Sequence, residues 1–459
     1  MTYPFVSRFF VAAAAALVLT PLAARAVTTT IDATKAGIVG DGTTLNTAQI
    51  QKAIDACAAA GGGVIDFPAG RYLTGTIQIK SNVTLRLEEQ ATLLGSTNVA
   101  DYRNVDPFID GSGNPLGHAL IVAMDADHVG VEGAGTIDGQ SPKLKATEHP
   151  YNMRPFLLRW VRCTDVTVKD VHLAEPGAWT LNFFQTKGAD IEGVTIRSRD
   201  LGIPNNDGID LDSCENIRIH KCDIISGDDA LVIKATSTTP SRNITATDCK
   251  LSTRTNAIKL GTESLGGFAN ITVSHCTVTN TRMAGIALNE VDGGDLGNVT
   301  ISDVTMDGVA APISIRLGAR LKAFRAGDQP KTAPGRLHDV TIRNVTAKNI
   351  ESIGILINGV PGHPVEALTL DNIRIDVPGG GNAKDAAVQL PEKEASYPEY
   401  NMFGKTLPVS GFYARHVRGM KLTNVVTTPV KPDGRPATAF VDVQDVTPAN
   451  FAGNSGALH

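Results

Sequence analysis

Short stretches of alternating apolar and polar residues recur along the chain, each followed by a turn and a second alternating stretch. The clearest copies are 216–222, 243–249 and 270–276, each of which begins with Asn and ends with Cys. The interval is constant, because 249 − 222 and 276 − 249 are both 27 residues. Alternation with period two indicates strands, and a fixed repeat of this size indicates a solenoid.

The repeats predict an all-β fold, a parallel β-helix in which each coil of the chain stacks on the one before. Helical periodicity is missing between the strands, and so is the Leu-x-x-Leu-x-Leu pattern of leucine-rich solenoids. Equivalent positions in a β-helix stack about 4.8 Å apart along its axis. We therefore expect Cys222, Cys249 and Cys276 to form a ladder of small buried residues rather than a redox or zinc site.

One segment near the start has the period of a helix. Asn46 is a candidate N-cap, and three glycines from Gly61 onward end the pattern. Because the last coil of a solenoid exposes apolar surface, we expect this helix, Thr47 to about Ala60, to close the N-terminal end. Its expected buried face consists of Ile50, Ala53, Ile54 and Cys57.

The first 26 residues are typical of a secretory signal peptide. Arg8 precedes an apolar run over 9–19, and Ala24-Arg25-Ala26 fits a small-x-small cleavage site. The run is too short to cross a membrane, which takes about 20 residues, and no later segment qualifies. We expect a signal peptide over 1–26, a single β-helix domain over 27–459, and a protein that is secreted or periplasmic.

Composition excludes several classes of protein. The chain of 459 residues has a net charge of −5 and 42% hydrophobic residues. Nucleic acid is not an expected partner, because phosphate binding normally needs a basic excess, and intrinsic disorder conflicts with the apolar content. We expect the chain to act as a monomer.

Acidic residues gather at the start of a second repeated strand. Aligning the coils stacks Asp207, Asp229, Asn256 and Ala284 in one column, with Asp228 next to it. Carboxylates a few ångströms apart raise the pKa of at least one member. One carboxyl that keeps its proton beside one that does not is what glycoside hydrolysis requires. Calcium is the other option for clustered carboxylates, but the spacing lacks the density of a calcium loop, so we expect no metal and no cofactor.

Two of these runs resemble motifs of glycoside hydrolase family 28, the polygalacturonases. The Asn-Asn-Asp-Gly at 205–208 resembles the family's Asn-Thr-Asp-Gly, and the Gly-Asp-Asp at 227–229 matches its Gly-Asp-Asp. The resemblance implies a right-handed, pectin-lyase-like β-helix that hydrolyses α-galacturonosyl bonds in pectic poly- or oligosaccharides, with inversion and without a metal. It implies that Asp228 is the general acid and that Asp207 and Asp229 activate water.

Two family motifs are replaced. Thr-Asn-Ala at 255–257 stands where the family has Gly-His-Gly, and Ala-Leu-Asn at 287–289 stands where it has Arg-x-Lys. Those basic residues hold the substrate carboxylate in the family, so other residues must bind the sugar here. The residues that we expect to do so are Asn205, Trp179, Lys234, Asn256, Lys259 and Arg316, with Arg282 as a further cation on the same face.

The repeat breaks over 391–411, where Tyr, Phe, Pro and Glu crowd together. Excursions from a solenoid usually lie on its working face, so this segment is expected to wall off one end of the groove and favour attack at chain ends. An inverting site also predicts about 6.5–9.5 Å between its acid and base carboxyls. The rival interpretations are a calcium-dependent β-helix lyase and a non-catalytic carbohydrate-binding solenoid.

Overall fold

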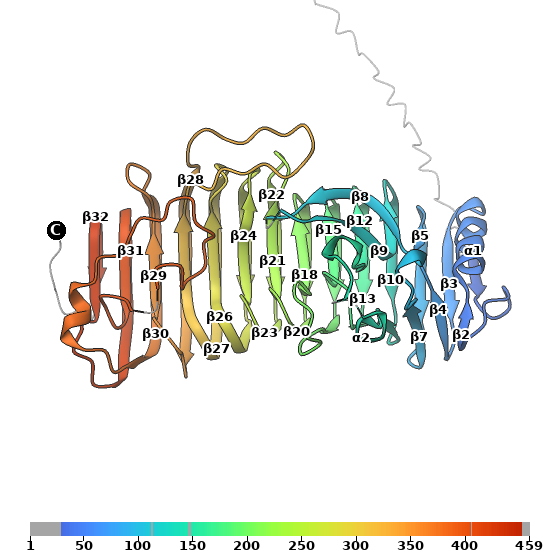
Figure 1. Ribbon diagram of the computed structural model, residues 1–459, viewed down its shortest axis with the longest axis horizontal. Helices are drawn as coiled ribbons and strands as arrows, with labels where there is room; N and C mark the ends of the chain where they lie inside the picture. Colours follow the sequence, from blue (N-terminus) through green and yellow to red (C-terminus); the bar gives the residue numbers. More distant parts are fainter. Residues whose placement is uncertain (1–28, 112, 146–147, 405, 452–459) are drawn as a thin grey trace, which may run out of the picture.

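The computed structural model describes residues 29–111, 113–145, 148–404 and 406–451. Their strands pair in parallel with strands one coil earlier and one coil later, so the chain winds into the predicted parallel β-helix (Figure 1). The predicted signal peptide lies outside the described residues. Within them, we find no helix of the length and apolarity that crossing a membrane takes.

The coils are built from three ladders of short strands, which merge into long corner-turning strands toward the C-terminus. Ladder 1 contains β5 (Ile77–Ile79), β9 (Pro115–Met124), β12 (Phe156–Val161), β15 (Leu181–Phe184), β18 (Ile209–Asp212), β21 (Leu231–Ala235), β24 (Ile258–Ser264) and β29 (Ile355–Asn358). Ladder 2 contains β1 (Thr29–Asp32), β3 (Gly63–Phe67), β6 (Val83–Leu87), β10 (Asp127–Glu132), β13 (Thr164–Lys169), β16 (Lys187–Glu192), β19 (Glu215–His220), β22 (Ser241–Thr247) and β25 (Phe268–Ser274).

Ladder 3 contains β2 (Asp41–Leu45), β4 (Gly70–Thr74), β7 (Ala91–Gly95), β11 (Thr136–Asp138), β14 (His172–Ala174), β17 (Thr195–Arg197), β20 (Asp223–Ser226) and β23 (Lys250–Thr253). The corner-turning strands are β26 (Thr277–Glu290), β27 (Asp295–Leu317), β28 (Arg336–Lys348), β30 (Val365–Gly379), β31 (Phe412–Lys431) and β32 (Thr438–Ala449). The remaining described elements are β8 (Arg103–Ile109), α1 (Thr47–Ala59), α2 (Ser141–Leu144) and the short 3-10 helices Val99–Asp101, Tyr151–Met153 and Ala383–Ala387.

Alternation along each strand sends one apolar set into the core. Ile217, Ile244 and Ile271 are register partners on successive coils and are all buried. The predicted cysteine ladder is confirmed, since Cys222, Cys249 and Cys276 are each 1% exposed and stack at one turn. All six cysteines of the chain lie in its described part, and they are free and buried. Their role is packing.

Helix α1 covers the N-terminal end as predicted (Figure 1), and it contacts β3 and β5. Its buried residues are the four predicted ones. Asn46 stands at the predicted N-cap position, but its side chain makes no capping bond to the helix. The side-chain NH2 group of Asn46 donates to the carbonyl of Val39 at 2.9 Å, and its side-chain oxygen accepts from the backbone amide of Val39 at 2.8 Å. These two bonds tie the preceding loop to the start of the helix.

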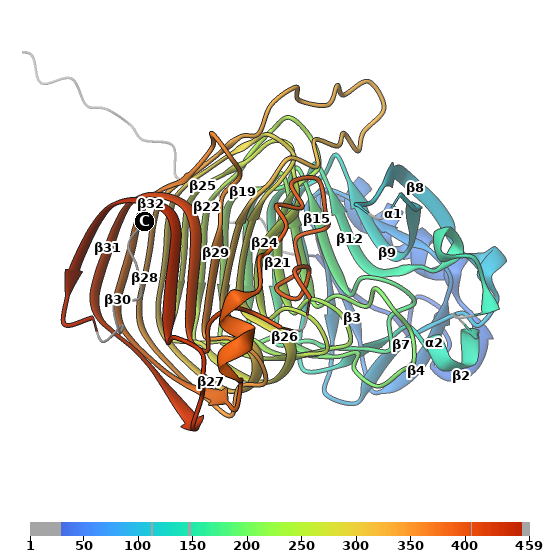
Figure 2. The ribbon, with the colours of Figure 1, turned by 60° about the vertical axis from the view of Figure 1, so that its left-hand side comes forward.

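Three segments leave the coils and meet beside ladder 1. They are the antiparallel hairpin of β8 and β9, the loop 318–335, and the segment 391–411 (Figure 2). The amide of Ile109 in the hairpin donates to the carbonyl of Phe324 in the loop at 3.3 Å. The guanidinium of Arg320 in the loop faces the ring of Tyr397 in the segment at 5.8 Å. These contacts enclose the outer face of ladder 1 near β18, β21 and β24.

Candidate active site

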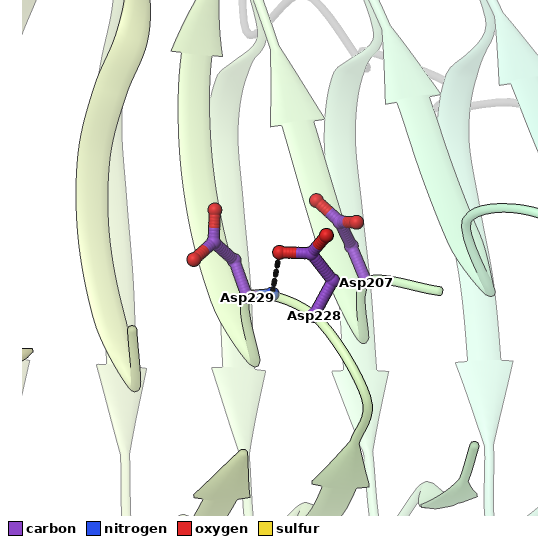
Figure 3. A group of neighbouring side chains, drawn as sticks. All are labelled: Asp207, Asp228 and Asp229. Carbon is purple, nitrogen blue, oxygen red and sulfur yellow. Dashed lines mark hydrogen bonds between the residues drawn. The ribbon is translucent and has the colours of Figure 1, made fainter. Parts of the chain in front are cut away.

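The predicted column of site residues is formed by the register of ladder 1. The amide of Gly208 donates to the carbonyl of Asp229 at 2.8 Å, and the amide of Ala230 donates to that of Asn256 at 2.9 Å. Asp207, Asp229 and Asn256 therefore stand side by side on three successive coils. One oxygen from each of Asp207, Asp228 and Asp229 lies within 4.8 Å of the others (Figure 3).

Asp228 is fixed by three donors. One carboxyl oxygen accepts from the amide of Asp229 at 2.9 Å and from the hydroxyl of Thr255 at 3.0 Å, and the other accepts from the amide of Asn205 at 3.2 Å. Burial, followed by the neighbouring charge of Asp229, raises the pKa of Asp228. A carboxyl held in place with a raised pKa is suited to donate a proton.

Asp229 has the opposite electrostatic environment. Burial alone would raise its pKa, but the Lys259 ammonium at 2.8 Å and the amide group of Asn256 at 2.9 Å lower it below the ordinary value. The same lysine has a pKa raised well above normal, because the attraction of Asp229 outweighs the desolvation that would lower it. This pair therefore keeps an ionised carboxylate next to Asp228.

Asp207 lies over a second buried lysine. The Lys234 ammonium is 3.6 Å from Asp207, 3.3 Å from Asp210 and 3.8 Å from Glu263. Burial, with the charges of Asp210 and Asp228, raises the pKa of Asp207, and burial raises that of Asp210 to about 7. Because one lysine faces three carboxyls, at least one of them is best accommodated with its proton.

Several residues of the site escaped sequence analysis. Asp210 and Glu263 lie on β18 and β24 with side chains on the outer face, yet both are buried. The carboxylate of Glu263 accepts from the amide of Gly111 at 2.6 Å, so the hairpin covers it. Glu399, from the segment 391–411, approaches Lys259 at 3.7 Å and Asn256 at 3.4 Å. The available signal was the run of charged residues at outward positions of consecutive coils.

Trp179, which we expected to bind the sugar, is buried beneath the hairpin. It stands one coil before Asp207, as predicted, but it is 2% exposed and packs against Phe108 and Phe156 beneath the hairpin. The ammonium of Lys234 lies 3.9 Å from the centre of its ring. Trp179 therefore forms the floor under Lys234, because the hairpin covers the face that a bare β-helix would leave open.

Arg316 also has a different role from the one expected. Its guanidinium is buried and donates to the carbonyls of Gly359 at 3.0 Å and of Glu392 and Lys393 at 3.1 Å each. These bonds anchor the segment 391–411 and use the donors that a uronate would need. Arg282 is exposed and lines a separate cavity of about 360 Å³ together with Arg199 and Glu351.

Asn205 lies next to the acid, as expected, with its backbone amide on Asp228. Its side-chain oxygen accepts from the guanidinium of Arg154 at 3.2 Å, and the same arginine donates to the carbonyl of Pro204 at 2.9 Å. The buried Arg154 thus fixes the turn that presents Asp207. The structure brings eight of the nine predicted site residues together, each through a contact with at least one of the others: Asp207, Asp228, Asp229, Asn205, Asn256, Lys234, Lys259 and, beneath Lys234, Trp179.

The three aspartates are also of the type that binds a cation, since their oxygens lie within reach of one ion. Lys234 and Lys259 already place two positive charges against Asp207 and Asp229, which would oppose a dication there. The absence of a metal from the reaction stays a prediction.

Comparison with known proteins agrees with this geometry. The model of glycosyl hydrolases family 28 matches residues 57–396. A probable polygalacturonase of Vitis vinifera is 28% identical over 371 residues, covering 74% of this chain and 72% of its own. An endo-polygalacturonase of Pectobacterium carotovorum is 26% identical over 366 residues, covering 75% and 87%.

A solved family 28 exopolygalacturonase of Yersinia enterocolitica superposes with a TM-score of 0.76 over 92% of this chain and 79% of that one, at 19% identity. At that identity the superposition supports the fold alone. The family match spans both aspartate motifs and ends at residue 396, before Glu399. The chain belongs to family 28 of the glycosyl hydrolases, and it is a glycoside hydrolase of the polygalacturonase type.

Proposed function

We propose that the three carboxylates hydrolyse α-galacturonosyl bonds in pectic poly- or oligosaccharides, with inversion and from chain ends. The observation that carries this proposal is the adjacency of Asp228 and Asp229 with pKa values displaced in opposite directions. A proton donor and an ionised carboxylate in one site are the two groups that glycosidic hydrolysis needs. A product profile on a panel of pectic oligosaccharides tests it, with new reducing ends as the expected result.

The contacts define a role for each carboxyl. Asp228 donates its proton to the oxygen of the leaving sugar. Asp229, which Lys259 keeps ionised, accepts a proton from water. Asp207, whose pKa is raised, orients that water from the neighbouring coil. Asp207 and Asp229 are therefore not equivalent as bases, because of these two only Asp229 has a cation at hydrogen-bonding distance.

One oxygen from each of the three carboxyls lies within 4.8 Å of the others. The separation of about 6.5–9.5 Å that is common at an inverting site is measured between whole carboxyl groups, and it stays a prediction for this site. A water molecule can bridge the carboxylates of Asp207 and Asp229, because two hydrogen bonds of about 2.8 Å span a gap of up to 4.8 Å. The attacking water then comes from the side of the column rather than from its middle.

We therefore expect inversion at the anomeric carbon. Proton magnetic resonance of the first-formed sugar measures it, and a β-product from an α-linked substrate is the expected result. Two carboxyls about 5–5.5 Å apart also suit a covalent, retaining route, so the measurement discriminates between the two. An α-configured first product would contradict the bridging water.

Attack at chain ends is supported by the segments around the site. The hairpin contacts Glu263 and the segment 391–411 contacts Lys259, so segments outside the coils flank the column of carboxylates at more than one point. We expect reducing ends to appear from polygalacturonan before its viscosity falls. A rapid fall in viscosity with mixed-length oligomers as early products would show an open groove instead.

Two rival functions are less well supported. A lyase needs a neutral Lys or Arg as base, but the pKa values of Lys234 and Lys259 are raised well above normal, since carboxylates face both. A carbohydrate-binding solenoid would not need three carboxyls in register. Export remains part of the proposal and rests on the sequence of residues 1–26, as the monomeric state rests on the sequence alone.

A further inference from the structure

The segment 391–411 adds two residues to the site that lie outside the repeat. The carboxylate of Glu399 is 3.7 Å from the ammonium of Lys259 and accepts from the side-chain amide of Asn256 at 3.4 Å. Both partners also bind Asp229, at 2.8 and 2.9 Å. Glu399 is therefore one contact away from the ionised carboxylate of the reaction.

The position of this segment is built into the fold. Arg316 donates to the carbonyls of Glu392 and Lys393, and Arg415 donates to those of Leu390 at 2.7 Å and Pro391 at 3.0 Å. The amide of Ala319 donates to the carbonyl of Glu394 at 2.7 Å. Further along, Phe403, Leu407 and Val409 are buried in an apolar cluster with Leu356 and Tyr413. These bonds place Tyr397 and Glu399 without help from a ligand.

The charges around Lys259 leave little attraction for a second acidic group. Lys259 is already shared between Asp229 and Glu399, and Lys234 is shared among Asp207, Asp210 and Glu263. A uronate carboxylate placed beside Glu399 would meet a like charge in a partly desolvated site, which is destabilising. A neutral sugar brings hydroxyl donors instead, and a carboxylate accepts such bonds strongly.

Tyr397 supplies the second half of a sugar site. Its side chain is 44% exposed, and its ring lies 5.6 Å from the ammonium of Lys259. Exposed aromatic rings with a polar tip bind ligands that have an apolar face and hydroxyl groups. The Glu399 side chain, two residues on, is 19% exposed and so remains accessible at the same place.

We propose that Tyr397 and Glu399 form a subsite for a neutral sugar ring next to the scissile bond, so that the substrate is a mixed pectic chain rather than a run of identical uronates. This inference rests on the proposed hydrolase function. Tyr397 packs against the apolar face of the ring, and Glu399 accepts hydrogen bonds from its hydroxyls while it repels a uronate in that position.

The test compares two substrates on matched variants. The substrates are an oligogalacturonide and an oligosaccharide in which galacturonate alternates with a neutral deoxyhexose, and kcat/KM is measured for each. The variants are Glu399→Gln, Tyr397→Ala and Tyr397→Phe, with Glu394→Gln as the control, since Glu394 has an exposed side chain in the same segment.

We expect the wild type to favour the mixed substrate, and Glu399→Gln to reduce that preference about tenfold, the scale of one hydrogen bond to a charged group. Tyr397→Ala should raise KM for the mixed substrate, Tyr397→Phe should leave it near the wild-type value, and Glu394→Gln should leave both substrates unchanged. A substrate ratio that Glu399→Gln does not alter overturns the proposal. An equal loss of kcat on both substrates also overturns it, since Glu399 would then only position Lys259.

Failure of the proposed function has a different signature. If neither substrate is hydrolysed, the hydrolase assignment fails, and calorimetric binding of the same two oligosaccharides to the Asp228→Asn variant still tests the subsite. Tighter binding of the mixed oligosaccharide that Tyr397→Ala abolishes supports the inference. Equal or absent binding of the two oligosaccharides overturns it.

Discussion

Replacing Asp228 by asparagine is expected to lower kcat about 10²–10⁴-fold, the usual scale of general acid–base catalysis, while the protein stays folded. Asparagine has nearly the same shape, and its side-chain oxygen can still accept from the amide of Asp229 and the hydroxyl of Thr255, so only the bond from the amide of Asn205 is lost. It has no acidic proton to give to the leaving oxygen. Initial rates on pectic oligosaccharides measure the loss, and thermal unfolding reports on the fold.

The matched control is Asp200→Asn. The Asp200 side chain is 67% exposed and pairs with Arg254 away from the column, so the same chemical change there should leave kcat within about twofold, as for most surface substitutions. Near-wild-type turnover of a folded Asp228→Asn protein would remove Asp228 from the role of acid. We expect the Asp228→Asn variant and the control to unfold at the same temperature. A lower unfolding temperature for Asp228→Asn would show that Asp228 has a structural role instead.

Replacing Lys259 by methionine is expected to have the second largest effect. The lysine lowers the pKa of Asp229 against the effect of burial, so its loss lets that pKa rise. More of Asp229 is then protonated at a given pH, and the acidic limb of kcat/KM moves to higher pH. At mildly acidic pH we expect a loss of about 10²-fold, the lower end of the range for acid–base catalysis.

A pH–rate profile with unfolding measured at each pH checks this expectation. Lys250→Met is the control, because Lys250 is an exposed lysine on the neighbouring ladder. Loss of one partner from a buried ion pair also costs about 3–5 kcal/mol, so rates are normalised to the folded fraction. An acidic limb that stays in place in the Lys259→Met variant would show that another group, such as Asp207, is the base.

The repeat made the fold and the column predictable. Each side chain of a strand points to one of two faces, so the apolar alternation around Ile209 and Leu231 determines which neighbours face outward. The same alternation determines which residues of successive coils stack on one another. Cys222, Cys249 and Cys276 add an independent register mark, since their spacing equals the coil length. Asp207, Asp229 and Asn256 follow from that register without any knowledge of side-chain contacts.

The rest depends on chain that does not repeat. Glu399 lies 140 residues after Lys259 (399 − 259), in a segment whose path no periodicity describes. Trp179 has the same place in its strand that an exposed platform would have, and only the hairpin around Gly111 makes it buried. Arg316 was indistinguishable from a substrate-binding cation in sequence, because the carbonyls that it binds belong to residues 359–393.

The most direct test of the account is hydrolysis of pectic oligosaccharides in heavy-oxygen water with a chelator present, followed by mass spectrometry of the products. The wild type should release fragments that carry one heavy oxygen at the new reducing end, with no unsaturated product, and Asp228→Asn should release almost none. Unsaturated fragments without the label would identify a lyase. Intact substrate with both proteins would show that the aligned carboxylates do not hydrolyse pectic glycosides.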